Sequence, residues 1–113
     1  MQKSTAVSLR ALAASIALMA LLIMHGNANA ADAQVKIANF TFEPAVLTVK
    51  VGTTVTWVND DDIPHLVSEK DGKFRSSALD TNETFSETFK EAGTIEYFCV
   101  LHPHMTGKIV VEP

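Results

Sequence analysis

The stretch Cys99-Val100-Leu101-His102-Pro103-His104-Met105 decides how the rest of the chain is interpreted. Cys99 is the only cysteine in the 113 residues, and Met105 is the only methionine after residue 24. A thiol, an imidazole and a thioether therefore recur at intervals of three residues. Soft sulfur ligands together with imidazole select copper, and two His, one Cys and a weak axial Met describe a blue-copper electron-transfer site. The second imidazole would come from His65, which directly follows Pro64.

The residues between position 30 and this run are typical of short strands separated by turns. No sustained helical period is present, and about seven to eight short strands without helices between them predict an all-β, antiparallel β-sandwich in a single domain. The expected strands include Val35–Phe42, Ala45–Val51, Thr53–Asn59, Thr84–Phe89, Thr94–Cys99 and Gly107–Val111.

The strand that precedes the run predicts where its side chains point. Side chains alternate along a strand, so Ile95, Tyr97 and Cys99 are expected to face the interior together. Cys99 then ends a strand, and His102 and Met105 are expected on the loop that leaves it. His104 is expected to point outward, because the set of four ligands is complete without it.

The first thirty residues have the features of a secretory signal peptide. Lys3 and Arg10 give the positive start, Ala11–Met24 is apolar, and Ala28-Asn29-Ala30 is a small-x-small cleavage site. The expected organisation is a cleaved signal peptide over residues 1–30 and a copper-binding domain over 31–113, exported to the periplasm. An uncleaved membrane anchor is the alternative, but the apolar run is too short to span a bilayer comfortably.

Charge limits the class of partner. Residues 31–113 carry seven Lys and Arg against thirteen Asp and Glu, a formal net charge of −6, which argues against nucleic-acid binding. Asp60, Asp61 and Asp62 precede the Pro64-His65 pair and form either a solvated loop or a patch that docks a basic partner. Because like charges repel, these three are not expected to fold inward.

Several segments together resemble the cupredoxins. They are Val55-Thr56-Trp57-Val58-Asn59, Pro64-His65, the run from Glu91 to Cys99, and His102 with Met105. The short Cys-x-x-His-x-x-Met spacing most resembles the amicyanins.

The resemblance implies a Greek-key β-sandwich that holds one type 1 copper ion, as Cu(I) or Cu(II), with His65, Cys99, His102 and Met105 as ligands. It implies a small soluble electron carrier, not an enzyme. Separately, the mature chain is expected not to span the membrane and to be a monomer. By analogy, a dehydrogenase would donate the electron and a c-type cytochrome would accept it.

One position departs from this pattern. Leu66 stands where amicyanins often carry Asn, whose side chain ties two ligand loops together; Asn59 is a candidate substitute.

Other functions are compatible with parts of the sequence. A periplasmic copper-handling protein without an electron-carrier role, or a zinc-binding module, would use the same ligands. A Cys–His nucleophilic enzyme is a weaker alternative, because no third orienting residue is evident. A purely structural adhesion-like domain would leave the Cys-His-Met run unexplained.

Overall fold

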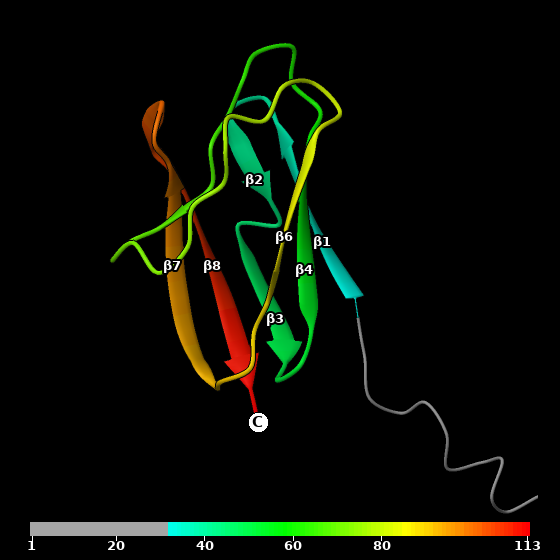
Figure 1. Cartoon of the computed structure of the whole chain (residues 1–113), viewed down its shortest axis with the longest axis vertical. Coiled ribbons are helices and arrows are strands. Elements are labelled where there is room, and N and C mark those ends of the chain that lie inside the picture. Colours follow the sequence, from blue (N-terminus) through cyan, green and yellow to red (C-terminus); the bar gives the residue numbers. More distant parts are fainter. Residues whose placement is uncertain (1–31) are drawn as a thin grey trace, which may run out of the picture.

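The structure, a computed structural model, describes residues 32–113. Within this range eight strands form two four-stranded sheets, with strand orders β2-β1-β4-β6 and β3-β8-β7-β5 (Figure 1). The predicted all-β sandwich is confirmed. The strands are β1 (Asp32–Ala38), β2 (Thr41–Glu43), β3 (Val46–Lys50), β4 (Thr54–Asn59), β5 (Ser68–Glu69), β6 (Thr84–Thr88), β7 (Gly93–Cys99) and β8 (His102–Glu112).

The predicted signal peptide, residues 1–30, lies outside the described residues. In the part of the chain that is described, no helix is long and apolar enough to cross a membrane.

The sheets are mixed, whereas antiparallel pairing was predicted. β1 pairs with β4 and β3 pairs with β8 in parallel, while the other strand pairs of the described residues are antiparallel. β1 and β4 can pair in parallel because β3, which lies between them in the chain, belongs to the other sheet; the chain crosses between the sheets near Pro44 and returns after β3. Pro44 has no N–H to donate and therefore does not continue the ladder of β2.

The core confirms the predicted orientation of β7. Tyr97 and Cys99 are buried, and Ile95 packs against the same cluster from a partly buried position. The aromatic centre of this core is Trp57, whose ring is fully buried. Cys99 therefore lies at the end of a strand whose inward face is continuous with the core.

The expected strand Val35–Phe42 is instead a hairpin. β1 and β2 are joined at Asn39 and Phe40, whose φ angles are 53° and 59°, and Ala38 pairs with Thr41. Positive φ at both central residues is the conformation of a tight two-residue hairpin turn, which Asn tolerates well. The turn removes Phe40 from the strand alternation and leaves it 52% exposed.

The last strand starts earlier than predicted. β8 begins at His102, so His102 and Met105 belong to an irregular strand and the prediction that they lie on a loop is wrong. Cys99 pairs with His102, yet the preceding residue Phe98 pairs with Thr106. The three residues between His102 and Thr106 thus form a bulge, in which Pro103 has no N–H for a ladder bond.

Candidate metal centre

Three of the predicted ligands meet where β4, β7 and β8 have their ends. His65, Cys99 and His102 offer ligand atoms that all lie within 4.8 Å of one another. Sγ of Cys99 lies 3.7 Å from Nδ1 of His65 and 3.6 Å from Nδ1 of His102. His65 and Cys99 are fully buried, and His102 is half-buried.

These separations fit a metal ion seated between the three atoms. Bonds of about 2.1 Å to nitrogen and about 2.3 Å to sulfur, the values found for zinc, place the two donors roughly 3.7 Å apart when the angle at the metal is near trigonal. Both imidazoles present the same nitrogen, Nδ1, to the sulfur. The donor chemistry, one thiol and two imidazoles, is that of a copper site.

Backbone pairing and one buried amide hold His65 in place. The N–H of His65 donates to the carbonyl of Leu79 (3.1 Å), and the N–H of Leu79 donates to the carbonyl of His65 (2.7 Å). Asn59 is fully buried; its Nδ2 donates to the carbonyls of Ile63 and Leu79, both at 2.8 Å, and its Oδ1 accepts from the N–H of Asp61. Asn59 thus ties the segment before His65 to the segment at Leu79.

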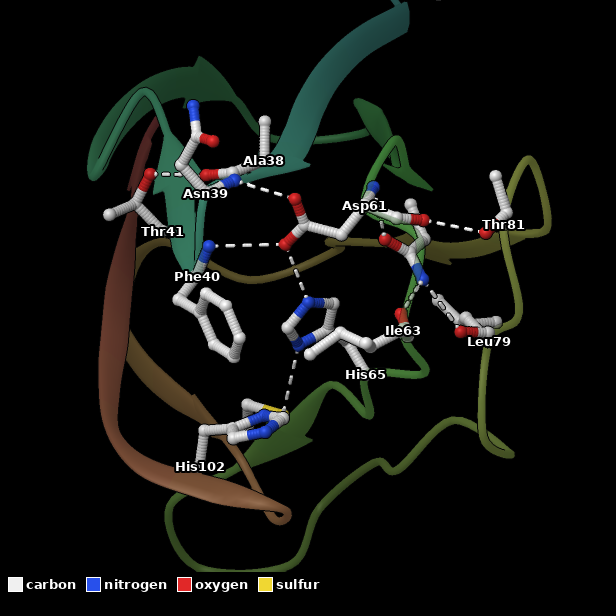
Figure 2. A network of polar contacts seen from close by, with 12 residues as sticks. Ala38, Asn39, Phe40, Thr41, Asp61, Ile63, His65, Leu79, Thr81 and His102 are labelled. Carbon is white, nitrogen blue, oxygen red and sulfur yellow. Dashed lines mark hydrogen bonds and ion pairs between the residues drawn. The ribbon is translucent and has the colours of Figure 1, made fainter.

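Asp61 folds inward, and the prediction that the acidic run stays outside is wrong for this residue. Its carboxylate accepts from Nε2 of His65 at 2.8 Å and from the N–H groups of Asn39 at 2.7 Å and Phe40 at 3.1 Å (Figure 2). These three hydrogen-bond donors offset the repulsion between the neighbouring carboxylates. Asp60 and Asp62 remain exposed, and Asp60 pairs with Lys36 at 3.7 Å.

The contact between Asp61 and His65 determines which nitrogen is free. A carboxylate can only accept, so Nε2 carries the proton, and in the neutral ring the lone pair of Nδ1 is directed at Cys99. Burial acts to raise the pKa of Asp61, but hydrogen bonds from the amides of Phe40 and Asn39 and from His65 outweigh it and hold the pKa below its usual value.

The sulfur of Cys99 also receives a backbone hydrogen bond. The N–H of Leu66 donates to Sγ at 3.4 Å, so a contact that stabilises a thiolate is present although Leu66 has no amide side chain.

Met105 is buried, 5% exposed, in the bulge of β8 and belongs to the core cluster. His104 is exposed, as predicted.

Phe40 is a neighbour of the centre that sequence reasoning missed. Its ring lies edge-on to His65 (centroids 5.7 Å apart, interplanar angle 87°) and to His102 (5.0 Å, 89°). Figure 2 shows the ring beside both imidazoles. The only local indication in the sequence was Asn39, because Asn is favoured at hairpin turns. A turn residue does not reveal which side chains the turn packs against.

Comparison with known proteins gives a consistent set of relatives. A family described as "Cupredoxin-like domain" matches residues 11–111. The chain is 38% identical over 113 residues to amicyanin-alpha of Methylorubrum extorquens, covering 95% of each chain. It is 45% identical over 83 residues to amicyanin of Paracoccus denitrificans, covering 69% of this chain and 63% of the relative.

Solved structures agree with these matches. A Cu(I) structure of a methionine-to-alanine variant of amicyanin has a TM-score of 0.68 and 40% identity, covering 72% of this chain and 82% of that one. A purple cupredoxin from Nitrosopumilus maritimus has a TM-score of 0.66 and 37% identity, covering 72% and 100%. With the donor set of the cluster, these matches confirm the predicted copper cofactor. None of these relatives is named as an enzyme, in agreement with the predicted class.

Proposed function

Because the chain belongs to the cupredoxin family, we propose that it carries single electrons on one type 1 copper ion held by His65, Cys99, His102 and Met105. The observation that carries the proposal is the meeting of both Nδ1 atoms at the buried sulfur of Cys99. Bound copper would supply a one-electron change between Cu(I) and Cu(II). The protein's own task is to hold the donors so that this change requires little movement.

The surroundings of the donors serve that task. Asp61 holds the ring of His65 through Nε2, and the amide of Leu66 donates to the sulfur of Cys99. Partners of this kind orient metal ligands and tune the metal. The Asp61 carboxylate precedes His65 and the Leu66 amide follows it, so one short segment supports both His65 and Cys99.

His102 offers the route by which electrons enter and leave. It is half-buried, whereas His65 is fully buried, so the edge of the His102 ring can reach the surface. Leu101 is 50% exposed beside it, and Pro103 is also exposed. A small apolar surface of this kind suits the weak and transient contacts of redox partners.

The compartment and partners form part of the same proposal. A signal peptide over residues 1–30 directs the domain 31–113 to the periplasm, where a dehydrogenase donates the electron and a c-type cytochrome accepts it. The features of residues 1–30 and the amicyanin relatives support this. Mass spectrometry of the exported protein should find Ala31 at the N-terminus; an intact first segment would contradict the cleavage.

The visible absorption spectrum after addition of one equivalent of Cu(II) tests the function. An intense blue band that ascorbate bleaches and an oxidant restores is expected. Cys99→Ser should abolish the band, because the thiolate bond is lost, and His104→Ala should retain it, because His104 is exposed. A colourless protein that still binds metal tightly would contradict the electron-carrier role and favour metal handling.

The axial position has its own test. Met105→Gln should keep a coloured site and lower the reduction potential, because a harder oxygen ligand favours Cu(II). Protein-film voltammetry measures the potential, and a rise would contradict Met105 as the axial ligand.

A further inference from the structure

We propose that Phe40 is a positioning residue of the metal centre, whose aromatic ring holds the His102 imidazole in the orientation that directs Nδ1 toward Cys99. The inference rests on the proposed copper site. It makes the β1–β2 turn a further segment of the centre, beside the segment at His65 and the β7–β8 segment.

The first support is the backbone of the turn. Phe40 has a φ of 59°, and a bulky side chain is uncommon in this left-handed region. The turn is held by Asp61, whose two carboxylate oxygens accept from the amides of Asn39 and Phe40, and by Thr41, whose hydroxyl donates to the carbonyl of Ala38 (2.7 Å). The same carboxylate holds His65, so the position of Phe40 is coupled directly to that of a metal-binding side chain.

The second support is what the ring contacts. Phe40 is 52% exposed and belongs neither to the buried core nor to the partly buried side chains packed against it. Its aromatic contacts are the two imidazoles, and the pair with His102 is the closer, with centroids 5.0 Å apart at 89°. Core packing does not explain this aromatic side chain, which lies in a strained turn. A role at the metal centre explains why its ring is edge-on to the imidazoles of His65 and His102.

The contact matters most for His102. His65 is buried and tied through Nε2 to Asp61, while His102 is half-buried and no side-chain partner for its Nε2 is present among residues 32–113. Edge-to-face aromatic pairs contribute enough free energy to change a rate or an equilibrium by roughly two- to tenfold. The Phe40 ring therefore limits rotation of His102 away from the sulfur.

Three substitutions separate the ring from the turn. Phe40→Asn keeps a residue that favours positive φ and removes the ring, Phe40→Leu keeps apolar bulk, and Phe40→Tyr keeps the ring. Val51→Ala is the matched control, because Val51 is also an exposed apolar residue, 39% exposed, and follows β3 beside Glu112 and Gly52, away from the centre. The full chain is loaded with Cu(II), and release to excess chelator is followed by loss of the blue band.

The expected result is copper release roughly two- to tenfold faster for the Asn and Leu variants, with the Tyr variant and the control close to the wild type. Copper release from Phe40→Asn at the wild-type rate would overturn the proposal. If Phe40→Leu releases copper at the wild-type rate, apolar cover of the imidazoles is sufficient and the aromatic ring has no special role. Faster release from Phe40→Tyr than from the wild type would also contradict a role for the ring.

A second readout separates this inference from the proposed function. In the metal-free protein, NMR should show nuclear Overhauser contacts between the Phe40 ring and the His102 ring. If the wild-type protein shows no blue band with Cu(II), the proposed electron-carrier function is contradicted. The nuclear Overhauser contacts in the metal-free protein would still test whether Phe40 positions His102. Their absence would overturn the role of Phe40 whatever the metal.

Discussion

Tyr97 and Gly107 show how closely single residues are matched inside the sandwich. Tyr97 is 1% exposed and lies edge-on to Trp57 and Phe42, with centroids 5.3 Å and 4.7 Å away. It pairs with Gly107 across β7 and β8. A Cβ at Gly107 would lie 2.4 Å from both Cζ and Oη of Tyr97, so the ring occupies the space that any larger residue would need.

Gly107→Ala is expected to destabilise the protein by about 1–3 kcal/mol, because the added methyl group must displace the buried ring of Tyr97. Urea unfolding of the metal-free protein measures this. Thr106→Ala, at the exposed neighbouring position, is the control and should change stability little. An unchanged midpoint for Gly107→Ala would mean that the ring can move at little cost.

Tyr97 also predicts how stability depends on alkaline pH. Burial raises its pKa to about 12, opposed only weakly by the Trp57 indole N–H, since neither Oη nor Nε1 has a hydrogen-bond partner of regular geometry among the described residues. The ordinary pKa is 10.0, so above that pH the unfolded chain loses this proton while the folded chain keeps it. The contribution of the protonated Tyr97 to the free energy of unfolding is therefore complete below pH 10. It falls by about 2–3 kcal/mol as pH rises toward 12.

Urea unfolding at a series of pH values from 8 to about 11 measures the slope. Tyr97→Phe removes the titrating hydroxyl and should flatten it. At neutral pH this variant should cost little, because the hydroxyl has no partner to lose among the described residues. An equal slope in Tyr97→Phe would assign the alkaline loss to other groups.

At the scale of elements, the β1–β2 turn and the segment before His65 act as one unit. Asp61 joins them, with a side chain 13% exposed that accepts from two backbone amides and one imidazole. Neither segment is long enough to be stable by itself, and a two-stranded hairpin is at best marginal in water. The carboxylate therefore contributes to the turn and to the metal centre together.

Asp61→Ala is expected to lower the free energy of unfolding of the metal-free protein by about 1.5–3 kcal/mol, because charge-assisted hydrogen bonds are lost and their donors are left unpaired. Urea unfolding measures this change. Asp60→Ala is the matched control, since Asp60 makes one exposed pair with Lys36, and its cost should be within about 1 kcal/mol. Equal effects of the two substitutions would contradict the special role of Asp61.

At the scale of the whole molecule, the metal centre joins the two sheets. His65 follows β4 of one sheet, while Cys99 and His102 belong to β7 and β8 of the other. A domain of this size buries only part of its surface on folding, and bound metal adds stability that the core alone does not supply. An ion held across the sheets resists their separation.

Copper should therefore raise the melting temperature of the protein. A ligand that binds only the folded state adds about 2.7 kcal/mol at one hundred times its dissociation constant, which corresponds to roughly 10 °C or more for a domain of this length. Differential scanning calorimetry with and without Cu(II) measures the shift. It should be largely lost in Cys99→Ser and retained in His104→Ala; equal shifts in both variants would place the binding elsewhere.

The sequence by itself determined the features that depend on neighbours along the chain. Alternation in β7 placed Tyr97 and Cys99 on the inward face, and the chemistry of the Cys-His-Met run indicated copper before any fold was known. Turn residues and β-branched runs predicted a sandwich. Asn59 does not replace the Asn that ties two ligand loops together, because its side-chain amide bonds the carbonyls of Ile63 and Leu79 and supports only the segment of His65.

Only the tertiary structure decided what depends on segments far apart. The amides that bind Asp61 lie 21 and 22 residues before it. Phe40 meets His102 across the two sheets, because the β1–β2 turn belongs to one sheet and β8 to the other. Local repulsion predicted an exposed acidic run, whereas long-range donors brought one carboxylate inward. The bulge that carries Met105 follows from the pairing of β7 with β8. Strand alternation and ligand softness are local properties, but the partners of a buried polar group are selected by the packing of the whole chain.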